Sequence, residues 1–88
     1  MKKHVKLYLK ILKYYPGEYI PCETCFKPSV DIHHIEARGM GGSNSKDTIN
    51  NLMALCRECH SKYGDKAQYK EYLKKTHEKR LHEMGIST

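Results

Sequence analysis

The sequence lacks the features of a membrane-spanning or exported protein. No apolar run in its 88 residues approaches the ~20 residues that a membrane-spanning helix needs. The lysine-bearing N-terminus does not read as an export signal, because Lys6, Lys10 and Lys13 interrupt the apolar segment from Val5 to Tyr15. Internal repeats and low-complexity tracts are missing too. We therefore expect a cytoplasmic protein, and in that reducing compartment paired cysteines are more often metal ligands than disulfides.

Length and charge narrow the class of protein further. A chain of 88 residues has room for one domain, whose small core commonly needs a metal or a disulfide as a staple. The formal net charge is +6: residues 1–13 carry five lysines and no acid, residues 14–61 carry six acidic and four basic side chains, and residues 62–88 carry seven basic and four acidic ones. A neutral-to-acidic centre between two basic arms suits a protein that holds a cation in its centre and binds a nucleic acid with its arms. The alternative is that the lysines only form the solvent-exposed surfaces of helices.

The spacing of apolar residues predicts a helix near the start of the chain and two short strands in its centre. His4–Tyr15 is amphipathic, with its lysines on one arc, and Pro16-Gly17 ends it. Residues 29–35 and 51–55 read as short strands, and residues 37–50 read as a glycine-rich loop. The second strand is expected to run directly into a helix.

The last part of the chain predicts a second basic helix. Gly64 breaks the chain, and Asp65 and Gln68 then have the spacing of a capping box for this helix. Its lysines repeat at i, i+4 spacing and form one stripe, which consists of Lys66, Lys70 and Lys74.

The four cysteines form two matched pairs, Cys22-Glu-Thr-Cys25 and Cys56-Arg-Glu-Cys59. The C-x2-C spacing lets both sulfur atoms of a pair reach one ion, and two such pairs supply the four ligands of a tetrahedral zinc site. Disulfides or a redox pair are the alternatives, but the expected compartment and the lack of a strand–helix context argue against them. The zinc would close a loop that contains the candidate catalytic residues, so its role is structural.

Inside this loop lie Asp31-Ile-His-His-Ile35, the glycine-rich loop, and Asn51-Leu-Met-Ala-Leu-Cys-Arg-Glu-Cys-His60. A lone HH or NL pair is uninformative, but this order of motifs resembles the HNH endonucleases of the ββα-metal fold. It is similar to the form with zinc knuckles, found among phage, restriction and mobile-element nucleases. The resemblance implies a small α+β fold. A zinc-stapled core of a β-hairpin and a helix (18–63) would lie between basic N-terminal (1–17) and C-terminal (64–88) helices.

The resemblance also assigns roles to individual residues. His34 matches the general base that activates water, and His33 and His60 match the ligands of a catalytic divalent ion. Asn51 matches the central asparagine that holds the base in orientation. Asn50 is a weaker alternative, because Asn51 directly precedes Leu52 and lies nine residues before His60. Histidine side chains suit the hydrolysis of a phosphodiester, because histidine titrates near neutrality and can act as a base for water. A divalent ion held by histidines would offset the negative charge on the phosphate.

One departure from the family bears on the catalytic ion. Some relatives have a further histidine four residues after the second ligand, where this sequence has Gly64. Two protein ligands, completed by water and phosphate oxygens, suit Mg²⁺ or Mn²⁺ better than tightly bound zinc. Asp31 is a candidate for a hydrogen bond to a ligand. The remaining histidines, His4, His77 and His82, are expected to be surface residues.

The resemblance therefore implies a metal-dependent endonuclease that cuts or nicks DNA, most simply double-stranded DNA, to leave 5′-phosphate and 3′-hydroxyl ends. The alternatives are a non-catalytic zinc-knuckle module that binds nucleic acid and, less well supported, a protein–protein module. Basic side chains would hold the phosphate backbone without reading its sequence, so specificity is weak or comes from a partner protein. The candidate contacts are Lys6, Lys10, Lys13, Arg38, Lys66, Lys70 and Lys74.

Overall fold

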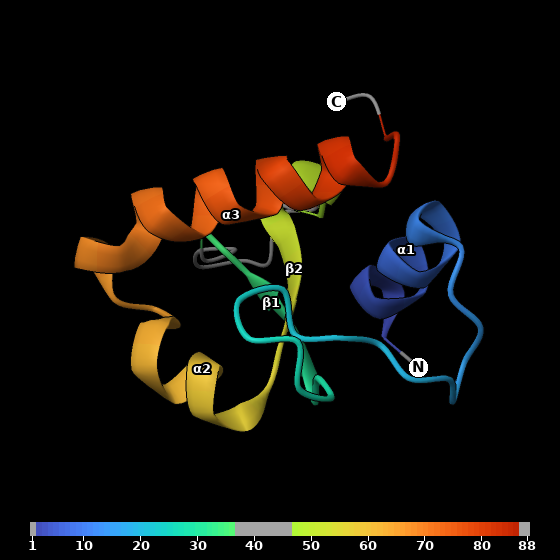
Figure 1. The fold of residues 1–88 in the computed structure, drawn as a ribbon, viewed down its shortest axis with the longest axis horizontal. Helices are drawn as coiled ribbons and strands as arrows, with labels where there is room; N and C mark the ends of the chain where they lie inside the picture. Colours follow the sequence, from blue (N-terminus) through green and yellow to red (C-terminus); the bar gives the residue numbers. More distant parts are fainter. Residues whose placement is uncertain (1, 37–46, 87–88) are drawn as a thin grey trace.

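The computed structural model describes residues 2–36 and 47–86. Its elements are α1 (Lys3–Leu12), β1 (Asp31–His34), the 3₁₀ turn η2 (Ile49–Asn51), β2 (Leu52–Leu55), α2 (Arg57–Tyr63), the 3₁₀ turn η3 (Ala67–Tyr69) and α3 (Lys70–Glu83). This is the small α+β fold that the sequence predicts, with an antiparallel β1–β2 sheet followed by a helix (Figure 1). Within the two described ranges, no helix is long and apolar enough to cross a membrane.

Strand β2 is completely buried, and its side chains supply the core on both sides of the sheet. Because successive residues of a strand point to opposite faces, Met53 and Leu55 join one apolar cluster, while Leu52 and Ala54 join a second. A strand covered on both faces reads as a continuous apolar run, and the LMAL segment does so. The pairing with β1 sets His33 opposite Met53.

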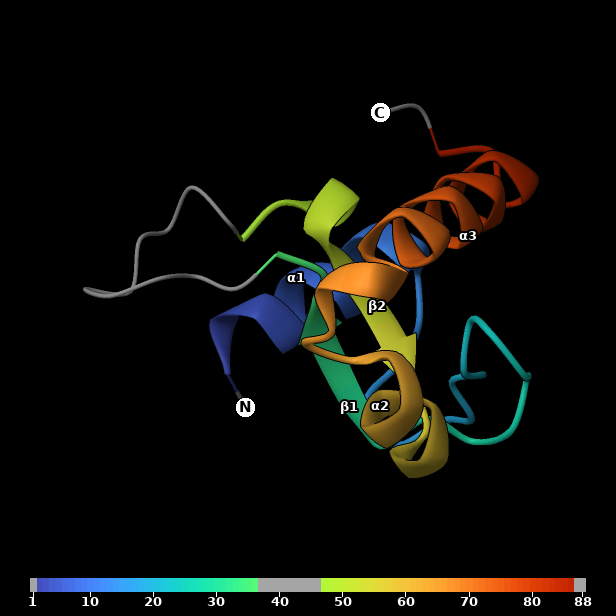
Figure 2. The same cartoon turned by 90° about the vertical axis from the view of Figure 1, so that its left-hand side faces the viewer.

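The helices cover both faces of this small sheet. Figures 1 and 2 show α1 and α2 on opposite sides of the β1–β2 hairpin. Helix α1 contributes Tyr8 to one apolar cluster, and Tyr63 of α2 packs against the other. Helix α3 contributes to both clusters, because Leu81 packs in the cluster of Tyr8 and Leu73 packs in the cluster that Tyr63 covers. A two-stranded sheet is marginally stable alone, so the hairpin depends in part on the packing of these helices.

Helix α1 ends three residues earlier than the sequence predicts. Lys13 adopts the left-handed conformation with φ 61°, and the Tyr14 N–H donates to the Leu9 carbonyl oxygen at 2.9 Å. This arrangement closes a helix C-terminus before Pro16-Gly17 is reached. Tyr15, expected on the apolar face of the helix, is instead 78% exposed.

The predicted capping box is also wrong. Asp65 has φ 58°, in the left-handed region, so it does not cap a helix. The chain continues through η3, and α3 begins only at Lys70. Asp65 is free to take part in a different site, described below.

The Glu23 carboxylate, within the first cysteine pair, is the centre of a buried polar network. It accepts hydrogen bonds from the Tyr8 hydroxyl (2.5 Å), the Ala54 N–H (3.2 Å) and His77 Nδ1 (2.7 Å). His77 Nε2 lies 2.5 Å from the Ile49 carbonyl oxygen. Both partners of the ring accept, so both ring nitrogens donate and His77 is a cation. Burial alone would lower the pKa of His77, but the hydrogen bond and charge of Glu23 outweigh it and raise the pKa. The expectation that His77 is a surface residue is wrong.

This network predicts a pH-dependent contribution of His77 to stability. We expect His77→Gln to lower the free energy of unfolding by about 3 kcal/mol, because removing one partner leaves a buried charge uncompensated. Because the pKa of His77 is raised in the folded state, its contribution to the free energy of unfolding is fully present below the unfolded-state pKa of about 6.5. This contribution is lost as the pH rises through the folded-state pKa. Urea unfolding of both proteins between pH 6 and pH 9 should therefore show a difference that shrinks with pH. The exposed His82→Gln is the control, and a difference that grows with pH would contradict the assignment.

Candidate metal and catalytic site

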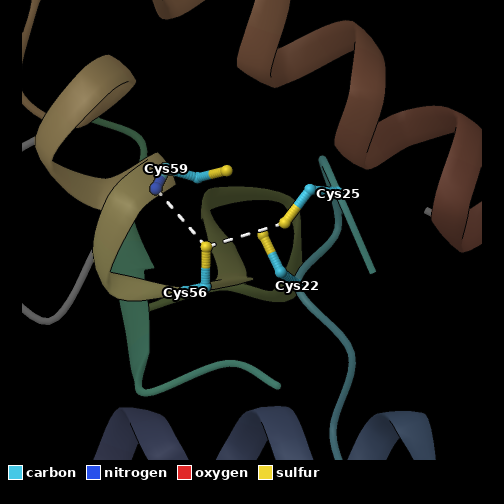
Figure 3. A group of neighbouring side chains, drawn as sticks. All are labelled: Cys22, Cys25, Cys56 and Cys59. Carbon is cyan, nitrogen blue, oxygen red and sulfur yellow. Dashed lines mark hydrogen bonds between the residues drawn. The ribbon is translucent and has the colours of Figure 1, made fainter. Parts of the chain in front are cut away.

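The four cysteines meet at one point, as the sequence predicts. Figure 3 shows Cys22 and Cys25 pointing toward Cys56 and Cys59 at the start of α2. All four sulfur atoms lie within 4.8 Å of one another, and those of Cys25 and Cys56 are 3.6 Å apart. Sulfur atoms around a tetrahedral zinc with bonds of ~2.3 Å are ~3.8 Å apart, whereas a disulfide brings them to ~2 Å. The cysteines are free thiols, and their arrangement is a metal site of the zinc type.

The local backbone explains how the second pair presents its sulfur atoms. Cys56 caps α2, and its sulfur accepts the Cys59 N–H at 3.4 Å.

The cysteines differ in how readily they ionise. Burial raises the pKa of Cys22, but hydrogen bonds from Thr24 and from neighbouring backbone N–H groups outweigh it and lower the pKa to about 6. Burial and the adjacent thiols raise the pKa of Cys59 to about 12. Cys22 is thus a ready thiolate ligand, while four thiolates this close together need a cation to balance their charge.

A second cluster of possible ligands lies in an open cavity of about 950 Å³ beside the hairpin. Ligand atoms of His33, His60 and Asp65 all lie within 4.8 Å of one another. Among the described residues, His33 Nε2 is the one buried side-chain nitrogen or oxygen atom without a hydrogen-bond partner. Burial, and secondarily the neighbouring His60, lower the pKa of His33, which favours the neutral ring that binds metals. An orphaned buried nitrogen beside two further ligands fits a metal ion.

The His60 ring is held by a carboxylate outside this cluster. Asp31 Oδ2 lies 3.1 Å from His60 Nδ1, so this nitrogen donates and the opposite nitrogen, Nε2, is left for an ion. Such a carboxylate–histidine–metal chain orients a ligand and increases its basicity. The sequence predicts this supporting role for Asp31, and the hydrogen bond to His60 fits it.

Gly64 explains why the third candidate ligand is one residue further along the chain. A Cβ atom at this position would lie 2.4 Å from His60 Cδ2 and 2.5 Å from the His60 carbonyl oxygen, so no side chain fits there. The left-handed conformation of Asp65, which aspartate tolerates better than most residues, brings its carboxylate to the two histidines instead. The sequence predicted two protein ligands and missed this one. The acidic residue directly after Gly64 was the available signal.

His34 lies in the same cavity with two neighbours that sequence reasoning also missed. Asp47 Oδ1 is 2.7 Å from His34 Nε2, and the His4 ring packs against the His34 ring with centroids 4.6 Å apart. The sequence classed His4 as a surface residue, but it is half-buried and lines this cavity with His33, His34, Asp47, His60 and Asp65. Adjacent strand residues point apart, so the His33 ring approaches His60 (centroids 4.8 Å) while His34 faces His4.

Asn51 clamps the chain just beyond the histidine pair. Its side-chain oxygen accepts the Glu36 N–H at 2.8 Å, and its side-chain nitrogen donates to the Glu36 carbonyl oxygen at 3.0 Å. Its backbone carbonyl accepts the Ile35 N–H at 2.9 Å. The buried Asn51 therefore fixes the two residues that directly follow His34 at the end of β1, whereas Asn50 is exposed.

The lysines that the sequence singles out do not line the cavity. Lys6, Lys10, Lys13 and Lys66 are exposed, whereas Lys70 and Lys74 are half-buried. Lys74 also pairs with Glu36, with Nζ 3.5 Å from a carboxylate oxygen. Arg38 lies outside the described residues. The N-terminal end of α1, with Lys2 and Lys3, borders the cavity, so basic side chains that the sequence did not single out are closer to the histidines.

The fold and its two clusters define a ββα-metal domain with a four-cysteine metal site. Comparison with known families matches residues 22–66, about half of the chain, to the sequence model of the HNH endonuclease family. The protein therefore belongs to the HNH endonuclease family, whose members are generally metal-dependent nucleases acting on nucleic acid. A search of curated proteins and a search of solved structures each give no match.

The four-cysteine site predicts that stability depends on a bound metal. Protein purified without added metal should contain about one zinc per chain by elemental analysis. Stripping that zinc should abolish the cooperative thermal transition, because a chain this short relies on metal binding for much of its stability. Restoring zinc should restore the transition. A metal-free protein that still melts cooperatively would show that the cysteine cluster is not needed for folding.

Proposed function

We propose that the protein is a metal-dependent endonuclease that hydrolyses phosphodiester bonds of DNA, with His34 as general base. The observation that carries the proposal is that His34 shares one cavity with a His33–His60–Asp65 ligand cluster. Hydrolysis of a phosphodiester needs a base for water beside a group that offsets negative charge, and the two sets of residues meet those needs. Membership of the HNH endonuclease family supports the same reading.

His33, His60 and Asp65 would hold the catalytic ion, with water and phosphate oxygens as its remaining ligands. Two imidazoles and a carboxylate suit Mn²⁺ well, and the carboxylate oxygen also suits Mg²⁺. When bound, the ion would offset charge on the scissile phosphate and on the leaving oxygen. Separately, Cys22, Cys25, Cys56 and Cys59 would hold a structural zinc that takes no part in the reaction.

The reaction proposed for the protein's own side chains is a single displacement. His34 removes a proton from a water molecule as the water oxygen forms a bond to phosphorus. The bond from phosphorus to the 3′ oxygen breaks, and the 3′ oxygen takes up a proton from solvent, leaving 5′-phosphate and 3′-hydroxyl ends. Asn51 acts indirectly, because its clamp on Glu36 fixes the strand end that carries His34.

The different roles of His33 and His34 give the sharpest test of this function. We expect His34→Ala to lower single-turnover cleavage by about 10²–10⁴-fold, because a positioned base is lost, and excess Mn²⁺ should not restore it. Three other variants should instead weaken the binding of the catalytic ion: His33→Ala, His60→Ala and Asp65→Asn. A higher Mn²⁺ concentration should therefore recover part of their activity. Asparagine suits position 65 because it tolerates the left-handed backbone there.

His82→Ala, which removes an exposed histidine of α3, is the matched control and should cut at the native rate. All variants should keep their zinc content and bind the DNA. Native-rate cleavage by His34→Ala would favour a base elsewhere or a non-catalytic zinc-knuckle module that binds nucleic acid. If excess Mn²⁺ restores His34→Ala as readily as it restores His33→Ala, the roles of base and metal ligand have been assigned to the wrong histidines.

The basic arms are proposed to hold double-stranded DNA through its phosphates. Replacing Lys66, Lys70 and Lys74 by alanine should flatten the slope of log affinity against log salt by about two to three, since each phosphate contact contributes ~0.9. The lower figure applies if Lys74 stays with Glu36 in the complex. Lys27→Ala, an exposed lysine paired with Glu58 outside both arms, should leave the slope unchanged. An unchanged slope in the triple variant would mean that this stripe faces solvent in the complex.

A further inference from the structure

We propose that Asp47 is a positioning residue that holds the neutral His34 ring with its hydrogen on Nε2, so that Nδ1 is the atom that takes the proton from water. The inference rests on the proposed function and goes beyond it, because it names the reacting nitrogen and the group that selects it. Asp47 belongs to the chain segment just before η2, and His34 ends β1. The two residues are 13 positions apart in the sequence.

The geometry selects one tautomer. Asp47 Oδ1 lies 2.7 Å from His34 Nε2, and the two side chains are only 5% and 15% exposed. An ionised carboxylate has acceptor atoms only, so the hydrogen of this bond must be on the ring nitrogen. A neutral imidazole has one N–H, and placing it on Nε2 leaves the lone pair on Nδ1. Asp47 thereby determines which nitrogen of His34 can act as a base.

The surroundings restrain both partners. Directly after Asp47, the Thr48 carbonyl oxygen accepts the Asn51 N–H at 2.9 Å, and Asn51 in turn clamps Glu36 on the other side of the site. The His4 ring packs against the His34 ring at a 49° tilt. The hydrogen bond that the His34 ring donates to Asp47 therefore sets the rotation of a ring whose position is already restricted by a neighbouring ring and a fixed backbone.

The charge of Asp47 has a second consequence during the reaction. When the proton moves from water to Nδ1, the water oxygen bonds to phosphorus, the 3′ oxygen departs with its bonding electron pair, and the His34 ring becomes positive. Its Nε2–H then donates to a carboxylate in a largely buried site, where a charge-assisted hydrogen bond is stronger than a neutral one. A neutral amide at position 47 could keep a hydrogen bond but could not stabilise the cation equally.

The first experiment measures the wild-type protein. Long-range ¹⁵N–¹H NMR of the zinc-loaded protein in Mg²⁺ distinguishes the two tautomers of a neutral histidine ring, and assignment of His34 uses His34→Ala. We expect the hydrogen on Nε2 and a bare Nδ1. A bare Nε2, with the hydrogen on Nδ1, would overturn the proposal whatever the activity of the protein.

The second experiment compares Asp47→Asn with Asp47→Ala in single-turnover cleavage of a labelled duplex. If the role were only structural, the isosteric amide would preserve the rate. We expect Asp47→Asn to lose about 10–100-fold, and Asp47→Ala at least as much, with thermal stability and Mn²⁺ dependence kept in the Asn variant. Glu71→Gln, an exposed carboxylate of α3, is the control for loss of one charge.

The outcomes separate this inference from the function on which it rests. A native rate for Asp47→Asn beside an inactive His34→Ala would overturn the role of Asp47 and leave the nuclease intact. A wild-type protein that does not cut any duplex would refute the nuclease, while the NMR measurement would still decide the tautomer.

Discussion

Four sulfur atoms, two from a loop before β1 and two from the start of α2, meet within 4.8 Å of one another. This meeting forces the chain between Cys25 and Cys56 to return on itself, and β1 and β2 are the hairpin that results. His33 and His34 lie on the outgoing strand, and His60 follows the last cysteine directly. A cation that holds the sulfur atoms together would therefore also hold the proposed base beside the proposed ligands, although it takes no part in the reaction.

The same loop carries the polar centre of the fold. Glu23 lies between Cys22 and Cys25 in the sequence. Its carboxylate accepts hydrogen bonds from Tyr8 of α1, from the Ala54 N–H of β2 and from His77 of α3. The three elements are thus tied to the first cysteine pair by buried hydrogen bonds that are all satisfied, which is the condition under which a buried charge is tolerated. Because His77 also contacts the turn η2 through the Ile49 carbonyl, α3 supports the segment that positions Asn51.

Motif spacing is sufficient to predict the cysteine cluster and the two short strands, which the family resemblance joins as a hairpin. It could not predict contacts that depend on how distant segments pack. His77 and Glu23 are 54 residues apart, and Asp47 reaches His34 across the glycine-rich stretch, so neither pair has a local signature. Asp65 was misread because its spacing to Gln68 fits a capping box, while its left-handed backbone and the crowding at Gly64 are properties of the folded chain.

In the proposed function, His34 and the neighbouring ligand cluster hydrolyse phosphodiester bonds with the help of a divalent ion. The most direct measurement incubates zinc-loaded protein with an end-labelled duplex, with and without Mg²⁺ or Mn²⁺, and identifies the ends of any product. The proposed function predicts cleavage only when the ion is present, with 5′-phosphate and 3′-hydroxyl ends. Tight, salt-sensitive binding of the duplex without cleavage in either ion would contradict it.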